Sequence, residues 1–112
     1  MAKTILVVDD DSDTLTLIGL TLQRRGFEVV KAQSGQQAIN VLAHDRPDLV
    51  ILDVMMPQMD GYEVCHEIKA DPRTADLPVI MLTAKAQTQS QLEGFRVGAI
   101  DYITKPVHPQ DL

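Results

Sequence analysis

The chain has 112 residues, 45% of them hydrophobic, which is enough for one compact domain to bury a core without disulfides or a structural metal. Its net charge of −6 argues against a surface that follows nucleic-acid phosphates, because such surfaces need clustered Lys and Arg. A single cysteine, Cys65, excludes an intrachain disulfide framework and fits a reducing compartment. The apolar run at 5–8 is too short for a signal-peptide core or a membrane span, so we expect a cytoplasmic protein that does not contact membranes.

Strands and helices are predicted to alternate along the chain. In order, we expect a strand at 5–8, a helix at 12–25, a strand at 27–32, a helix at 34–44, a strand at 49–52, a helix at 61–71, a strand at 79–82, a helix at 87–97 and a strand at 101–104. The strands at 5–8, 49–52 and 79–82 are continuously apolar, as in parallel strands buried on both faces. The other two carry polar residues, which suits the edges of a sheet. The alternation predicts right-handed βαβ units and a doubly wound α/β fold.

Local signals mark the ends of several predicted helices. Ser12 and Ser34 are expected N-caps, and Gly26 and Gly98 are expected to follow helix ends.

The first helix is expected to bury one stripe of its surface. We assign Leu17, Ile18 and Leu22 to that stripe, with Leu15 at its edge and Leu20 well outside it.

Polar side chains gather where the predicted strands end. In an open α/β sheet, ligands bind beyond these carboxyl ends, at the point where the winding reverses. The residues at these positions are Asp9, Asp10 and Asp11 after the first strand, Asp53 at the end of the third, Thr83 at the end of the fourth, and Lys105 after the fifth. The sequence therefore predicts one site with several carboxylates, a hydroxyl and an ammonium group.

A cation is expected among these carboxylates, because two unit charges about 4 Å apart repel by roughly 4 kcal/mol at an effective dielectric constant near 20. Mg²⁺ suits a site with one or two carboxylates, a phosphate and several waters, and Mn²⁺ accepts similar ligands. Such an ion would let Asp53 attack phosphorus and form an aspartyl phosphate. Thr83 could donate a hydrogen bond to a phosphoryl oxygen, and Lys105 could supply a mobile positive charge. Simple helix capping is the competing interpretation for Asp11 and Asp13.

Four sequence motifs together resemble the receiver domains of two-component response regulators, over almost the whole chain. They are VVDDD at 7–11, LDVMMPQMDGYEV at 52–64, MLTAK at 81–85 and DYITKP at 101–106. The resemblance implies one receiver domain at 1–112, with a flavodoxin-like, doubly wound five-stranded parallel sheet of order 2-1-3-4-5. It also implies a cytoplasmic module for two-component (phosphorelay) signal transduction. Such a module is no enzyme in the usual sense, although it carries out its own phosphorylation and dephosphorylation.

The resemblance also implies specific residue roles. Asp53 would be the phosphoacceptor, Asp10 a direct metal ligand, and Asp9 a ligand through water. The main-chain carbonyl of Met55 would be a further metal ligand. Thr83 and Tyr102 would form a switch pair, and Lys105 would contact the phosphoryl group. The donor would be a sensor histidine kinase or a histidine phosphotransfer protein, and neither nucleic acid nor membrane would bind this segment.

Three alternatives are weighed against this interpretation. A haloacid dehalogenase-type phosphohydrolase has a DxDx[TV] motif, but the fifth residue is Asp13 counted from Asp9 and Leu15 counted from Asp11. A calcium-binding EF-hand loop starting at Asp9 would need glycine at Thr14 and glutamate at Leu20. The third alternative is a binding scaffold with a receiver fold that takes no phosphate.

The C-terminal end of the sequence also bears on assembly. The fifth helix of the family would begin near 108–110, so we expect it to be largely missing. Apolar side chains of the third to fifth strands would then be exposed. We therefore expect either a longer chain or a homodimer in which a second copy covers this face.

Overall fold

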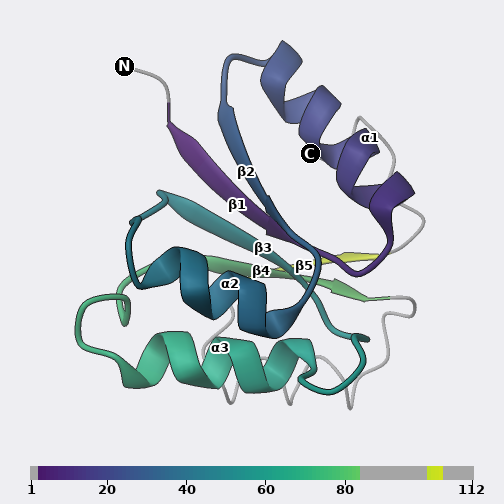
Figure 1. Ribbon diagram of the computed structural model, residues 1–112. Helices are drawn as coiled ribbons and strands as arrows, with labels where there is room; N and C mark the ends of the chain where they lie inside the picture. Colours follow the sequence, from purple (N-terminus) through teal and green to yellow (C-terminus); the bar gives the residue numbers. More distant parts are fainter. Residues whose placement is uncertain (1–2, 84–100, 105–112) are drawn as a thin grey trace.

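The computed structural model describes residues 3–83 and 101–104, and five parallel strands form its sheet (Figure 1). The strands are β1 (Thr4–Val8), β2 (Glu28–Ala32), β3 (Leu49–Asp53), β4 (Val79–Thr83) and β5 (Asp101–Thr104). Their order across the sheet is β2-β1-β3-β4-β5. The predicted order and the predicted edge positions of the two polar strands are confirmed.

Helices cover both faces of the sheet. They are α1 (Ser12–Arg24), α2 (Gly35–Leu42) and α3 (Gly61–Ala70). Figure 1 shows α1 on one face and α2 and α3 side by side on the other, as right-handed crossovers in a doubly wound sheet require. The predicted helix at 87–97, the predicted stop at Gly98 and the segment expected to begin the fifth helix lie outside the described residues.

Two apolar cores lie on opposite faces of the sheet. On the α1 face, Ile5 and Val7 of β1 pack with Ile18 and Leu22 of α1. On the other face, Leu6 and Val8 of the same strand pack in a cluster that includes residues of α2 and α3. Successive side chains of a strand point to opposite faces, so a strand between two helical layers must be apolar throughout.

The N-cap of α1 is Asp11, and the prediction of Ser12 is wrong. The Asp11 carboxylate accepts a hydrogen bond from the Asp13 backbone N–H at 3.2 Å and another from the Thr14 hydroxyl at 2.7 Å. Ser12 is the first residue of the helix proper. Asp and Ser cap helices about equally well, so propensity alone did not separate these neighbours. The predicted N-cap Ser34 is confirmed, because its hydroxyl accepts from Gln37 N–H at 3.1 Å.

Gly26 follows the end of α1, as predicted, with a left-handed φ of 93°. The Phe27 N–H donates to the Leu22 carbonyl at 3.1 Å, and the Gly26 N–H donates to the Gln23 carbonyl at 3.0 Å. This pair of bonds is a Schellman motif, in which glycine avoids the steric cost of a positive φ.

The buried stripe of α1 differs from the prediction in two residues, Leu15 and Leu17. Leu15 is 3% exposed and lies in the core with Ile18 and Leu22, whereas Leu17 is 40% exposed. Residues at i, i+3 and i+7 share one helix face, so Leu15 aligns with the other two, whereas Leu17 lies about 100° around the helix axis from Ile18. Leu20 is exposed, as predicted.

No helix in the described part of the chain is long and apolar enough to cross a membrane.

Candidate functional site

Three carboxylates meet at the carboxyl edge of the sheet. Asp9, Asp10 and Asp53 each offer a carboxylate oxygen, and these oxygens lie within 4.8 Å of one another. Asp9 and Asp53 are buried, and Asp10 is exposed at the mouth of the cluster. Mg²⁺ and Mn²⁺ prefer such oxygen donors, and a partly exposed cluster leaves room for bound waters. The donor set therefore fits a divalent cation.

Backbone contacts orient the Asp9 side chain. Asp9 directly follows β1, and its N–H donates to the carbonyl of Ala32, the last residue of β2, at 3.1 Å. The Asp11 N–H donates to Asp9 Oδ1 at 2.9 Å. Because Asp11 itself caps α1, the aspartates of the 9–11 run divide between two tasks. Asp9 and Asp10 join the carboxylate cluster, and Asp11 begins the helix.

Asp53 is the last residue of β3 and is 2% exposed. It lies opposite Leu82 of β4, and the next residue, Val54, donates its N–H to the Leu82 carbonyl at 2.9 Å. The Met55 N–H donates to Asp53 Oδ1 at 3.3 Å. Strand pairing and the following loop thus hold the phosphoacceptor candidate from two sides.

The β3–α3 loop, residues 54–60, folds back on the end of β3. The Gly61 N–H donates to the Val54 carbonyl at 3.0 Å and closes the loop. Within it, the Met59 N–H donates to the Pro57 carbonyl at 2.8 Å across Gln58, whose φ is 70°. This three-residue turn carries strain for a residue other than glycine. This closure was not predicted, although Asp60-Gly61 before a helical pattern is a sequence signal for a tight turn into α3.

Thr83 lies on the strand next to Asp53. It is the last residue of β4 and is 5% exposed. Tyr102 lies in β5, where its backbone pairs with Met81. Lys105 lies outside the described residues. The structure thus brings Asp9, Asp10 and Asp53 together and puts Thr83 at the end of the neighbouring strand.

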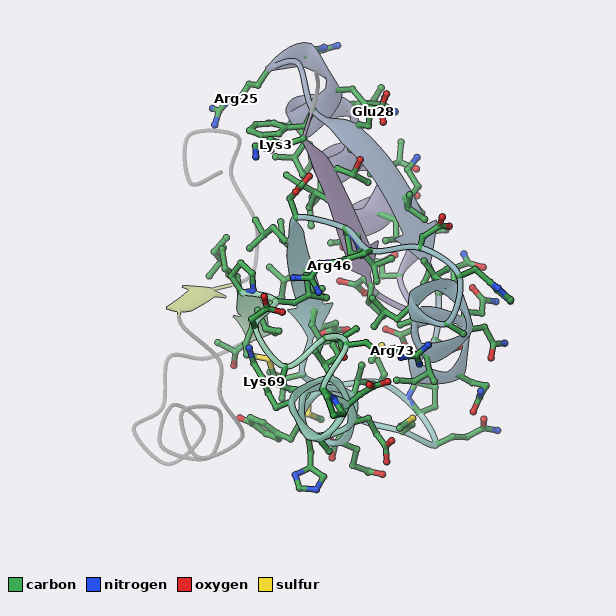
Figure 2. The ribbon with its side chains drawn as sticks, turned by 90° about the vertical axis from the view of Figure 1, so that its left-hand side faces the viewer. Lys3, Arg25, Glu28, Arg46, Lys69 and Arg73 are labelled. Carbon is green, nitrogen blue, oxygen red and sulfur yellow. The ribbon has the colours of Figure 1, made fainter. Side chains whose placement is uncertain are left out.

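The end of the sheet opposite the carboxylate cluster, where the parallel strands begin, carries basic side chains (Figure 2). Figure 2 looks at the ends where the strands begin, and it shows basic side chains there together with Glu28. The labelled basic residues are Lys3, Arg25, Arg46, Lys69 and Arg73. Two ion pairs lie there, Arg46 with Asp76 at 2.8 Å and Arg73 with Asp71 at 2.9 Å.

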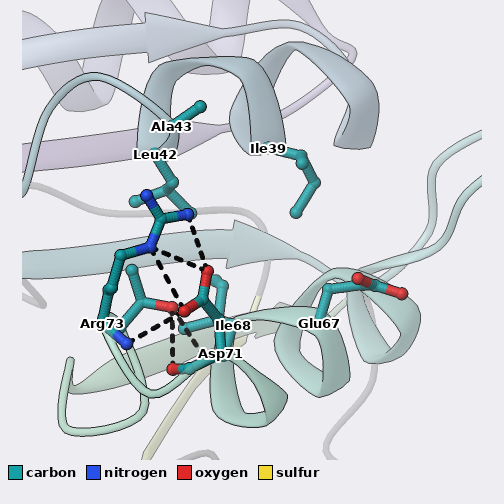
Figure 3. A pocket seen from close by; sticks show the side chains of 8 residues that line it. Ile39, Leu42, Ala43, Glu67, Ile68, Asp71 and Arg73 are labelled. Carbon is teal, nitrogen blue, oxygen red and sulfur yellow. Dashed lines mark hydrogen bonds and ion pairs between the residues drawn. The ribbon is translucent and has the colours of Figure 1, made fainter.

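A hollow of about 130 Å³ lies between the C-terminal ends of α2 and α3 (Figure 3). Ile39 and Leu42 line one side, and Asp71 and Arg73 line the other. Hydrogen bonds from Arg73 lower the pKa of the Asp71 carboxyl. Asp71 and Arg73 are hydrogen-bonded to each other. The hollow therefore does not present a group of carboxylate oxygens to one ion, as the cluster of Asp9, Asp10 and Asp53 does.

Cys65 lies on the buried face of α3, in the core, and is not a member of the carboxylate cluster. Burial raises the pKa of its thiol, and the nearby charge of Lys69 offsets this only in part. A neutral buried thiol is chemically inert, so Cys65 acts as a small apolar core residue.

The family model described as "Response regulator receiver domain" matches residues 5–112. The chain belongs to this family. A receiver domain in two-component signalling is thus what the fold, the carboxylate cluster and the sequence all indicate.

Individual relatives agree with this assignment. The phosphate regulon transcriptional regulatory protein PhoB of Pseudomonas aeruginosa is 43% identical over 112 residues, which are 100% of this chain and 49% of that protein. The chain therefore spans about half the length of this relative. The solved chemotaxis protein CheY4 of Vibrio cholerae has a TM-score of 0.95 at 32% identity, covering 98% of this chain and 92% of that one.

A further solved relative contains a metal ion. It is the receiver domain of sensor histidine kinase PA1611 from Pseudomonas aeruginosa, with a magnesium ion coordinated in its active site cleft. It has a TM-score of 0.90 at 30% identity, and the match covers 99% of this chain and 91% of that one.

Proposed function

We propose that residues 1–112 act as one receiver domain that accepts a phosphoryl group on Asp53 in a Mg²⁺-dependent reaction. The observation that carries this proposal is the carboxylate of Asp53, buried at the end of a central strand and clustered with Asp9 and Asp10. A buried carboxylate among like charges is unfavourable unless a cation or a reaction requires it there.

Asp10 and Asp53 are proposed to hold Mg²⁺ directly, together with the main-chain carbonyl of Met55. Asp9 is proposed to act through a bound water, and Mn²⁺ would be accepted by the same donors. The magnesium ion in the PA1611 receiver domain supports this assignment. The bound ion would neutralise charge on the incoming phosphoryl oxygens.

In the proposed step, a carboxylate oxygen of Asp53 attacks phosphorus in line with the leaving group. A P–O bond to Asp53 forms, and the bond from phosphorus to the donor's imidazole nitrogen breaks. The donor is proposed to be a phosphohistidine of a sensor kinase or a phosphotransfer protein. The electron pair of the broken bond stays on its departing imidazole. Thr83 would donate its hydroxyl hydrogen to a phosphoryl oxygen, and Lys105 would pair with its negative charge.

Phosphorylation is proposed to switch the conformation through Thr83 and Tyr102. Movement of the Thr83 hydroxyl toward the phosphoryl group would open space into which the Tyr102 ring turns. The domain would work in the cytoplasm as a signalling module with its own phosphorylation and dephosphorylation chemistry. We propose no direct contact of these residues with nucleic acid, and a homodimer as one form of assembly.

The phosphoacceptor proposal predicts a metal-dependent acyl phosphate. Incubation with acetyl phosphate and Mg²⁺ should add one phosphoryl group to the intact mass, and chelation by EDTA should prevent the addition. Hydroxylamine should remove the group, because it cleaves acyl phosphates and spares phosphoserine. A scaffold that takes no phosphate would show no mass change under any of these conditions.

The exposed face of α1 is proposed to receive the kinase. Leu17 and Leu20 are 40% and 46% exposed and lie on the helix that begins beside the carboxylate cluster. Apolar side chains near the centre of an interface carry much of its binding energy. Leu15 is buried and takes no part in this surface.

Leu20→Arg should therefore slow phosphotransfer from the cognate kinase and leave phosphorylation by acetyl phosphate unchanged. Asn40→Arg provides a control at an exposed position of α2, on the opposite face of the sheet from α1 (Figure 1). Rates would be compared by radiolabel transfer. Equal kinase rates for wild type and Leu20→Arg would contradict docking at this position.

A further inference from the structure

We infer that Gly61 is a positioning residue for the phosphoacceptor: the missing side chain lets the first turn of α3 fix the backbone of Asp53. This inference rests on the proposed function of Asp53. It adds a requirement, the absence of a side chain at position 61, that does not follow from the carboxylate cluster.

The backbone of β3 occupies the space that a side chain at position 61 would need. A Cβ atom there would lie 2.2 Å from the Asp53 carbonyl oxygen and 2.9 Å from both the Asp53 carbonyl carbon and Val54 Cα. Among the described glycines, only Gly26 has a positive φ, so Gly61 is required for space rather than for conformation. A clash with backbone cannot be relieved by a rotamer change.

The same contact holds the metal-binding segment in place. The Gly61 N–H donates to the Val54 carbonyl at 3.0 Å, and Asp60 caps α3 by accepting from Glu63 N–H at 2.9 Å. Met55, a proposed metal ligand, lies in the loop that these bonds close, and Asp53 directly precedes that loop. Any atom added at position 61 must therefore displace the segment, the helix, or both.

Such a displacement would separate the Asp53 carboxylate from Asp9 and Asp10, which follow β1, where Asp9 is hydrogen-bonded to Ala32 and Asp11. Metal sites are sensitive to this kind of change, and loss of an orienting group costs about 10-fold to 100-fold in metal affinity. Misplacement of reacting groups by about 1 Å can also lower a rate by about 100-fold.

Gly26→Ala provides a matched control for Gly61→Ala. Both variants add one methyl group and both lower stability. At Gly26 the cause is a left-handed φ, with nothing within 4 Å of the added atom. Gly26 follows the C-terminal end of α1, whereas Asp9 and Asp10 precede its N-terminal end. Its substitution should therefore leave the positions of the carboxylates unchanged.

The test measures Mg²⁺ affinity by calorimetry and the acetyl phosphate reaction rate at saturating Mg²⁺, both below the melting temperature of each variant. Gly61→Ala should bind Mg²⁺ about 10-fold or more weakly. It should also react more slowly at saturating Mg²⁺, because the acceptor itself has moved. Gly26→Ala should match wild type in both measurements despite its lower melting temperature. Wild-type values in Gly61→Ala would overturn the inference.

A second pair of variants applies if Gly61→Ala does not fold. Asp60→Ala and Asp60→Ser both remove the carboxylate, but only serine can still cap α3. The alanine variant should bind Mg²⁺ more weakly than the serine variant, and equal affinities would overturn the inference. If wild type itself neither bound Mg²⁺ nor took a phosphoryl group, the proposed function would fail, and the inference with it.

Discussion

Asp53→Asn is expected to abolish phosphorylation, both by acetyl phosphate and by a phosphohistidine donor. The amide is nearly the same size as the carboxylate, so it fits the buried site at the end of β3, where Asp53 is 2% exposed. It lacks the negative charge and the nucleophilic oxygen that the reaction needs. Intact-mass spectrometry would record the loss, and circular dichroism would show that the fold is retained.

Asp48→Asn is the matched control for this variant. Asp48 directly precedes β3, at the end of the strand opposite to Asp53. Its Oδ2 accepts a hydrogen bond from Thr4 N–H at 2.8 Å. This substitution should leave phosphorylation intact and change only stability. A phosphoryl group that persisted in Asp53→Asn, with its hydroxylamine-reactive site at another residue, would refute the assignment of the acceptor.

The fold was predictable because its central strands must be apolar on both faces. The runs at 5–8, 49–52 and 79–82 became β1, β3 and β4 with boundaries shifted by one residue at most. Asp53 and Thr83 end two of these strands, and polar residues there are informative because burial makes them unfavourable without a function.

The details that sequence patterns missed depend on competition between neighbours. Asp11 and Ser12 are both good N-caps, and only the position of the α1 backbone selects Asp11. Leu15 and Leu17 lie about 200° apart around the helix axis, so only one of the two can share the buried face of Ile18 and Leu22, and that residue is Leu15.

The role of Gly61 was similarly invisible in the sequence. A glycine before a helical pattern has many uses, and its contact with the Asp53 backbone depends on how the β3–α3 loop closes. A contact between segments that only the tertiary fold brings together leaves no periodic pattern in the sequence.

Mg²⁺ is expected to raise the melting temperature of the protein through the carboxylate cluster. The oxygens of Asp9, Asp10 and Asp53 lie within 4.8 Å of one another, so a bound cation reduces their mutual repulsion in the folded state. The unfolded chain does not hold these groups together, and the ion therefore stabilises the folded state alone. At a free Mg²⁺ concentration about 100 times the dissociation constant, this adds about 2.7 kcal/mol, or about 10 °C for a chain of this length.

Asp10→Asn should remove most of this shift, because Asp10 is the exposed member of the cluster and is proposed to bind the ion directly. Without metal, this variant should melt at least as high as wild type, since one of three like charges is gone. Asp13→Asn, in the first turn of α1 but outside the cluster, should keep the full Mg²⁺ shift. Differential scanning calorimetry with Mg²⁺ and with EDTA compares the three proteins. An equal Mg²⁺ shift in wild type and Asp10→Asn would mean that the ion binds elsewhere, because the cluster would then have lost a ligand without losing affinity.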